Sequence, residues 1–359
     1  MKQLSRGAIR LFLSIGLVAV AGQEAGAFVS NDGCTYLHAK INCSSVEGSF
    51  VMAPKALKLG ASRTADSVGG HAAGAANQGF SKLRGHSPDS DIIHGFATGE
   101  AGGVGVGLWG NGSFTDAETD FTTLRSQTDL INGSIGIDFL LDNRFVLGIA
   151  ATYEDSETAT TFNSGQNDTT GYMVSPYAAV AVDEFVTLDL SFGYGLFDAD
   201  QRRRSGGSTI TSSYDMERTF AAVNLNTYGN IDNWSFSGLF GLLYARDALD
   251  DYVESAGRNV SRETVELLQS SVGVEVSYPF QVVEPYISGI WEYDLNHEER
   301  RTGGGNGVAL PYDDNAFNVG GGLRFTFNET VSAELGGYAI LERDDEEEYS
   351  ASGNLRFDF

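Results

Sequence analysis

The sequence lacks the features of two common classes of protein. No stretch after residue 21 approaches the roughly 20 apolar residues that a transmembrane helix needs, which excludes a helical membrane protein. No lysine follows residue 98, and residues 99–359 carry 42 acidic residues against 14 arginines, within a chain of net charge −25. This acidity argues against nucleic-acid binding, which requires cations that displace counterions from phosphates.

Cysteine is also scarce. Cys34 and Cys43 are the only two, and they enclose eight residues in a segment that we expect to face an oxidising compartment. We predict a disulfide between them, which would stabilise so short a loop by about 2–3 kcal/mol. A metal site would need further ligands, and His38 between the cysteines gives three at most. No metal or other cofactor is predicted.

The first 27 residues have the features of a secretory signal peptide. Three cations precede an apolar run of 11 residues, Leu11–Ala21, and Ala25-Gly26-Ala27 forms a small-residue cleavage site. We therefore expect the mature chain to begin near Phe28. The predicted organisation is a signal peptide (1–27), a short N-terminal segment or linker that is a vestigial passenger or a plug (28–98), and a β-barrel (99–359).

From about Val104 onward, apolar residues recur with period two, which is typical of strands with one apolar and one polar face. From Val186 to Leu196, for example, the even positions are apolar and the odd positions are polar or glycine. Most runs exceed the ~9–11 residues that cross a bilayer at the tilt of a barrel. We count twelve, at approximately 104–114, 129–141, 144–154, 170–182, 185–198, 214–231, 234–246, 262–278, 283–296, 315–327, 330–343 and 348–359.

The connections between these runs alternate in length. Five are tight, such as Asp142-Asn143 and Asp232-Asn233, and six are longer, with Arg202–Arg204 and Asp344–Glu348 expected in the longer ones. Short turns at one end and long loops at the other are typical of transmembrane barrels, whereas sandwiches and propellers have shorter strands and no carboxylates on core faces. We predict an all-β, antiparallel transmembrane barrel of about 12 strands, whose N-terminal segment can thread the pore.

Aromatic residues support a barrel that crosses a membrane. One set flanks the tight turns and a second set follows 8 to 12 residues along the same strands, which predicts two girdles around a lipid-facing band. The first set is Phe139, Phe145, Phe185, Trp234, Tyr278, Phe280 and Phe327, and the second is Tyr153, Phe197, Tyr244, Trp291, Tyr293 and Phe317.

Charged residues on the polar faces are expected to line the lumen, because carboxylates facing lipid are costly. If the pore is open, we expect it to favour cations. If it is closed, the six cations of residues 28–98 are the only basic partner that the chain offers, and replacing Lys82 and Arg84 by Glu is predicted to raise conductance. The main predicted lumen-facing charges are Asp138, Asp189, Glu275, Glu284, Glu292, Asp294, Arg324 and Glu334.

The end of the chain resembles a known signal. The last strand places Leu355, Phe357 and Phe359 on one face, and its terminal phenylalanine is similar to the signal by which bacterial outer-membrane proteins are recognised for barrel assembly. Leu108-Trp109-Gly110 and residues 133–153 resemble the opening hairpins of the autotransporter (type V secretion) β-domain. The resemblance covers roughly residues 99–359.

This resemblance implies an outer-membrane barrel of a Gram-negative bacterium, exported through a cleaved signal peptide. Outer-membrane lipid, lipopolysaccharide and the barrel-assembly machinery are the implied partners. Autotransporters usually carry several hundred residues ahead of the barrel, whereas about 70 are available here. In the family a linker helix runs through the pore, and residues 71–84 are a candidate for it, although disorder fits that segment equally well.

Three functions remain open from the sequence. The first is a translocator that displays or seats the short N-terminal segment, and the second is a cation-leaning porin or structural surface barrel plugged by it. The third is an outer-membrane hydrolase built on His297, the one histidine of the barrel, with Asn296 and Glu298 beside it. Catalysis needs a base, a nucleophile and a third group, and spacing ties no serine or aspartate to His297. We therefore predict no enzymatic activity.

Overall fold

The structure is a computed structural model that describes ten stretches of the chain in two compact units, divided after Ser44. The described part of the first unit is a hairpin of β1 (Cys34–Leu37) and β2 (Lys40–Cys43). The described residues are 34–37, 40–43, 53–83, 104–119, 125–161, 163–205, 207–297, 314–328, 330–341 and 346–359. The predicted signal peptide lies outside them.

The backbone of the β1–β2 hairpin brings together the two cysteines for which we predicted a disulfide. Its register places Cys34 directly opposite Cys43. Opposed residues of antiparallel strands have Cα atoms about 4.5–5.5 Å apart, which lies within the range that disulfides span. The two side chains lie outside the described residues, so the disulfide stays a prediction.

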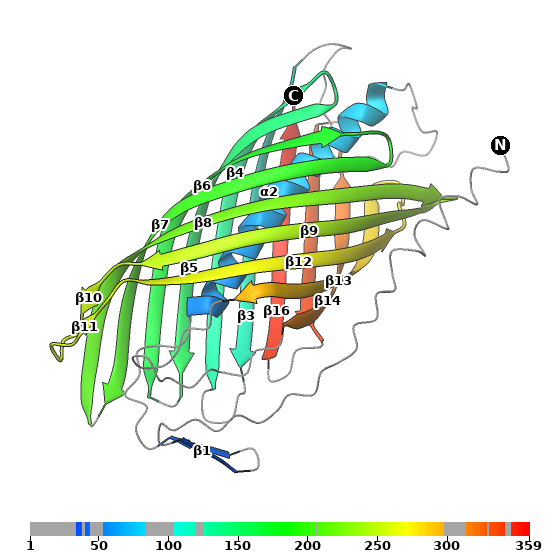
Figure 1. Cartoon of the computed structure of the whole chain (residues 1–359). Helices are drawn as coiled ribbons and strands as arrows, with labels where there is room; N and C mark the ends of the chain where they lie inside the picture. Colours follow the sequence, from blue (N-terminus) through cyan, green and yellow to red (C-terminus); the bar gives the residue numbers. More distant parts are fainter. Residues whose placement is uncertain are drawn as a thin grey trace. The chain divides into compact units, whose positions relative to one another are not determined.

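Twelve antiparallel strands of the second unit form a closed barrel (Figure 1). The barrel closes where the last strand pairs with the first, and there Val106 and Phe359 exchange backbone hydrogen bonds of 3.1 and 2.8 Å. The predicted fold class is confirmed. The strands are β3 (Gly105–Thr119), β4 (Ser126–Leu141), β5 (Phe145–Thr160), β6 (Gly165–Ala181), β7 (Val186–Ser205), β8 (Ser208–Ile231), β9 (Trp234–Leu249), β12 (Glu263–Ser277), β13 (Val283–His297), β14 (Asn315–Thr326), β15 (Val331–Ile340) and β16 (Glu346–Asp358).

The alternation along each strand sends apolar side chains outward and polar side chains into the lumen. In β7, Leu190 is 57% exposed on the outer face, whereas its neighbour Asp189 is 1% exposed. Soluble proteins have the reverse arrangement, with apolar side chains inside and polar ones outside. The apolar exterior fits a barrel that is surrounded by lipid. The buried core is therefore the lumen itself.

The tight turns use residues that tolerate left-handed backbone. Asp142 and Asn143 have φ angles of 51° and 50°, so the β4–β5 hairpin turns through two left-handed residues, as a type I′ turn requires. Asp232, between β8 and β9, has a φ of 53°. Aspartate and asparagine adopt this region more readily than other residues that carry a side chain, which explains their places at these turns.

Two charged segments that we expected in outer loops belong partly or wholly to strands. Arg202–Arg204 lie in β7, which pairs with β8 as far as Ser205 and Ser208. Glu346–Glu348 begin β16 and pair with the end of β3. Both expectations were wrong because backbone pairing continues past the apolar band, where the side-chain pattern no longer marks a strand.

The extended end of β7 and β8 carries a small hairpin, β10 (Tyr252–Val253) and β11 (Asn259–Val260). Arg203 forms a buried ion pair with Glu254 at 2.9 Å, and Tyr214 stacks on Tyr252 with ring centroids 4.9 Å apart.

One girdle residue lies on the other side of the barrel wall from the one we expected. Phe197 is 2% exposed and belongs to a cluster of buried apolar side chains in the lumen, together with Tyr214 and Tyr252. Phe197 is an odd position of a strand whose even positions face lipid, so the alternation already placed it on the inner face. The girdle prediction was wrong for this residue.

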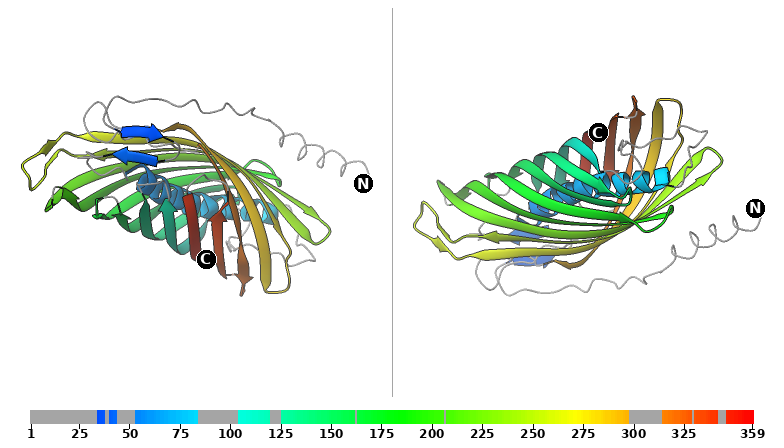
Figure 2. Two further views of the ribbon diagram at one scale, coloured as in Figure 1. Left: turned by 90° about the horizontal axis from the view of Figure 1, so that it is seen from below. Right: turned by 90° about the horizontal axis from the view of Figure 1, so that it is seen from above.

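One helix, α2 (Ala53–Leu83), lies inside the ring of strands, as the views from below and above show (Figure 2). It contacts β3–β9 and β12, and most extensively β4, β6 and β7. It begins well before residue 71, where we expected a linker helix to start. No helix among the described residues is both long and apolar enough to cross a membrane.

Candidate functional site: a helix seated in the barrel lumen

Small side chains form the surface by which α2 meets the barrel wall. Ala61, Ala65, Ala72 and Ala76 are buried and recur three to four residues apart or at multiples of that spacing, so they share one face of the helix. Alanine lets the helix backbone come close to the strands. The position of α2 is therefore set by close packing against β4–β8.

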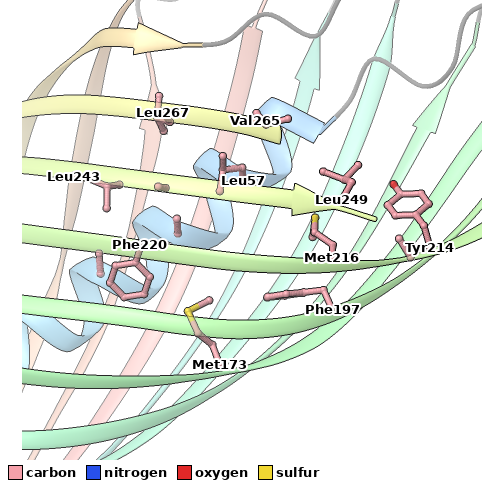
Figure 3. Packing of buried hydrophobic residues seen from close by; sticks show 14 of the residues in the cluster. Leu57, Met173, Phe197, Tyr214, Met216, Phe220, Leu243, Leu249, Val265 and Leu267 are labelled. Carbon is pink, nitrogen blue, oxygen red and sulfur yellow. The ribbon is translucent and has the colours of Figure 1, made fainter. Parts of the chain in front are cut away.

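The first turns of α2 rest on an apolar cluster at the long-loop end of the barrel. Leu57 packs there with inward side chains of β6–β9 and β12, and Figure 3 shows four of them, Met173, Phe197, Phe220 and Leu243, on the wall beside the helix. The opposite end of α2 packs near the tight turns, where Val68 and Ala76 join a second buried cluster. The helix therefore runs from the long-loop end to the tight-turn end.

A buried ion triad lies directly beneath the helix. Arg218 donates to both carboxylate oxygens of Asp247 at 2.8 and 2.9 Å and to Glu154 at 2.6 Å. Its guanidinium also lies 4.6 Å from the ring centroid of Phe197. A Cβ at position 60 would lie 2.3–2.6 Å from the side-chain ends of Arg218 and Glu154, so any residue larger than glycine must displace the triad where α2 crosses it.

Two basic side chains of α2 reach the opposite wall. Lys58 Nζ lies 3.2 Å from Asp294 Oδ2 and 3.5 Å from Glu292 Oε2, both on β13. Arg63 donates to Glu348 of β16 at 2.9 Å, and its guanidinium lies 4.1 Å from the ring centroid of Tyr338. These ion pairs bridge α2 to the strands that its small face does not touch.

Near the tight turns, an aromatic stack holds the helix. His71 stacks on Trp109 with ring centroids 4.2 Å apart and planes 18° apart. Trp109 donates to the Tyr177 hydroxyl at 2.8 Å, and that hydroxyl donates to Asp138 at 3.1 Å. Arg356 completes the chain with two hydrogen bonds to Asp138 at 2.8 and 2.9 Å.

A second arginine gathers carboxylates away from the helix. Arg324 contacts Glu275 at 2.7 Å, Glu284 at 3.3 Å and Glu334 at 3.2 Å, and it lies over the ring of Tyr286. Among the described side chains, three carboxylates therefore share one guanidinium.

The structure places the predicted lumen-facing charges in three groups. Glu275, Glu284, Glu334 and Arg324 form the cluster just described, and Glu292 and Asp294 bind Lys58 of the helix. The third group is two separate carboxylates. Asp138 pairs with Arg356, whereas Asp189 accepts hydrogen bonds from Asn224 and Asn226 at 2.9 and 2.8 Å.

Several lumen residues were missed by the sequence reasoning. Glu154 ends the predicted run 144–154, and Asp247 directly follows the run 234–246; the alternation of each run places its residue on the inner face. Lys58 and Arg63 precede the segment that we considered for the pore. The side chains of Lys82, Arg84 and His297 lie outside the described part of the structure, so their predicted roles stay untested.

The C-terminal residues proposed as an assembly signal lie on the outer surface. Leu355, Phe357 and Phe359 are 42%, 36% and 55% exposed, on the lipid side of β16. Within the ten described stretches, no group of three or more histidine, cysteine or acidic residues is placed to hold a metal ion.

A closed barrel with an apolar exterior and a helix in its lumen defines a transmembrane β-barrel of the outer-membrane type. The family described as "Autotransporter beta-domain" matches residues 108–337. The chain belongs to this family, which confirms the resemblance stated above.

Solved structures agree with this assignment. The chain is similar to the translocator domain of the autotransporter NalP from Neisseria meningitidis, with a TM-score of 0.63 and 13% identity over 82% of this chain and 99% of that one. It is also similar to the β-domain of the Bordetella autotransporter BrkA (TM-score 0.59, 14% identity, 70% and 98% covered). A third is the transport unit of AIDA-I from Escherichia coli (TM-score 0.55, 15% identity, 79% and 99% covered). No curated protein matches the sequence.

Proposed function

We propose that this protein is a translocator that displays the residues preceding α2 outside the cell and keeps α2 in its lumen. The direction of the helix carries the proposal. Leu57 packs at the long-loop end and Val68 near the tight turns, and long loops of such barrels face outward. The chain before Ala53 therefore continues from the outer end of the lumen.

The charge distribution supports the same path. Residues 28–98 hold six cations and five acids, whereas residues 99–359 carry a large excess of acids. Lys58 and Arg63 bind carboxylates of the wall, so an acidic lumen favours a segment that carries positive charge. The barrel provides a polar passage for the N-terminal segment. Movement through it stops when α2 fills the lumen.

The location and partners of the protein belong to the same proposal. A cleaved signal peptide would deliver the chain to the periplasm, and Leu355, Phe357 and Phe359 would be read by the barrel-assembly machinery. Outer-membrane lipid and lipopolysaccharide would then surround the apolar exterior. Barrels of this family serve in secretion. The absence of enzymatic activity in this chain stays a prediction.

Surface labelling tests the proposal. An epitope tag is inserted after Ser45, and intact cells are treated with antibody or with protease. A tag at Gly257, which is exposed in the turn between β10 and β11 at the long-loop end, is the positive control. A tag between Asp232 and Asn233, in a tight turn, is the negative control.

The expected result is that the tags after Ser45 and at Gly257 are reached and the tight-turn tag is not. If only the Gly257 tag is reached, the N-terminal segment is not displayed and the proposal is wrong. Gel migration before and after heating shows in each case that the tagged barrel has folded.

A further inference from the structure

The helix fills the lumen unevenly. It packs closely on β4–β8, but on its other side a cavity of about 40 Å³ lies between α2 and strands β8, β9, β12 and β13. One water needs roughly 10–15 Å³, so the cavity has room for an ion or a small ligand. Polar side chains with oxygen atoms form part of its lining. They are Ser62 and Asp66 of α2, Asn224 of β8, Gln269 and Ser271 of β12, and Glu292 of β13.

Hydrogen bonds set the direction of the two amides on the wall of this cavity. Asn224 donates from Nδ2 to Asp189 at 2.9 Å, and Gln269 donates from Nε2 to Asp294 at 2.7 Å. Both amide nitrogens are therefore already in use, which leaves the carbonyl oxygens as acceptors. These oxygens can take a hydrogen-bond donor or a cation from the cavity.

A buried hydroxyl of the helix points to a ligand. Ser62 lines the cavity and is 8% exposed, and its Oγ has no hydrogen-bond partner among the described residues. Leaving a buried polar atom without a partner is costly, and a bound ion would remove that cost. On the wall, a Cβ on Gly241 would collide with the Ser271 hydroxyl and with the Asn224 carbonyl oxygen, so glycine at this position keeps the two oxygens close together.

Two carboxylates line the cavity, and each shares its nearest cation with another carboxylate. Glu292 lies 3.5 Å from Lys58 Nζ, but that ammonium lies closer to Asp294, at 3.2 Å. Asp66 lies 3.7 Å from Arg63, whose shorter ion pair, at 2.9 Å, is with β16. Among the described side chains, the two carboxylates of the cavity therefore keep an excess of negative charge.

We infer that this cavity binds one divalent cation of the Ca²⁺ type. Such hard cations take oxygen ligands, and Ca²⁺ binds about six to eight of them, among them carboxylates, amide carbonyls and water. The cavity offers two carboxylates and four neutral oxygen-bearing side chains, without the nitrogen or sulfur ligands that zinc and copper prefer. The side chain of Asp66 is 68% exposed, which leaves part of the coordination shell to water.

The bound ion joins the helix to the far wall of the barrel. Ser62 and Asp66 of α2 share it with side chains of β12 and β13, which the alanine face of the helix does not meet. The ion therefore acts beside Lys58 in fixing the seat of α2. The inference goes beyond the proposed function and does not require display of the N-terminal segment.

Direct binding of Ca²⁺ to the folded full-length protein tests the site. Equilibrium dialysis against radioactive Ca²⁺ is carried out in a neutral detergent, which contributes no phosphate, and in excess KCl. We expect one ion per chain. Asp66→Asn keeps the size of the side chain but removes its charge, and should weaken binding by about tenfold or more. Ser62→Ala removes only the unpartnered hydroxyl, and should weaken binding severalfold.

Asp129→Asn is the matched control, because Asp129 lies opposite Asp116 on the outer face and should leave the affinity unchanged. Heat-dependent gel migration shows that each variant has folded. It also gives a second readout, since Ca²⁺ should raise the unfolding temperature of the unaltered protein and not that of Asp66→Asn.

Three results would overturn the inference. The first is the absence of stoichiometric Ca²⁺ binding by the unaltered protein, and the second is an unchanged affinity in both lumen variants. The third is an equal loss of affinity in Asp129→Asn, which would place the ion on the outer face. The surface-tag experiment is unaffected by any of these results.

Discussion

Most carboxylates on the inner face of strands β3–β7 are paired with cations, whereas those on the outer face lie beside one another. On the inner face, Glu154 and Asp138 are buried and each is bound by an arginine. On the outer face, above the apolar band, five carboxylates lie directly opposite one another across adjacent strands. The register aligns Asp116, Asp129, Glu157, Asp168 and Asp200.

This difference between the two faces shows where the barrel can carry carboxylates without a paired cation. Like charges directly opposed in a sheet are destabilising, but exposure to water and salt reduces the cost. A carboxylate in the lumen beneath α2 has no such screening, so it needs an arginine or, like Asp189, neutral hydrogen-bond donors within hydrogen-bond distance. The inner face is therefore rigid and specific, and the outer face is tolerant of substitution.

The largest effect should come from breaking the inner triad. Arg218→Met leaves Glu154 and Asp247 buried without their cation, and loss of one partner from a buried ion pair costs about 3–5 kcal/mol. We expect a strong fall in the free energy of unfolding, measured in urea by heat-dependent gel migration. Arg218→Met combined with Glu154→Gln and Asp247→Asn should recover much of the loss. No recovery would mean that the triad acts through packing rather than charge.

A smaller effect should follow from filling the space above the triad. Gly60→Leu forces a side chain into Arg218 and Glu154, and overpacking of this kind costs about 1–3 kcal/mol. We expect α2 to lose its seat, with higher conductance and, in a background where Trp234 and Trp291 are replaced by Phe, a change in Trp109 fluorescence. Gly70→Leu is the matched control, because a Cβ there meets nothing within 4 Å. Equal behaviour of the two variants would contradict the role given to Gly60.

The smallest effect should come from the outer face, with the opposite sign. Asp129→Asn removes the charge that lies between those of Asp116 and Glu157, which should stabilise the barrel by about 0.2–1 kcal/mol. The gain should be largest at low ionic strength and shrink as salt screens the row. Thermal unfolding midpoints at two salt concentrations measure it. Asp251→Asn, an exposed carboxylate outside the row, should show no comparable gain.

Much of the barrel could be predicted from the sequence because its signals are local. Period two shows which face of a strand meets lipid, and turn residues such as Asp142 and Asn143 mark the tight ends. The extension of β7 and β8 could not be predicted, because strands outside the membrane need no apolar face. Arg202–Arg204 were therefore interpreted as a loop.

The helix seat was harder to predict for a different reason. Each face of α2 meets a different wall, with alanines on one side and Lys58 and Arg63 on the other, so no single apolar stripe marks it. Gly60 gives no sequence signal either, because glycine ordinarily weakens a helix. Its purpose is visible only once Arg218 is placed beneath it.

A helix inside a closed ring of strands makes the chain a threaded molecule, comparable to the axle of a rotaxane. With the β3–β16 seam closed, α2 can leave only by sliding along its own axis. Lateral escape of the axle therefore depends on how fast the seam opens rather than on the individual contacts of α2.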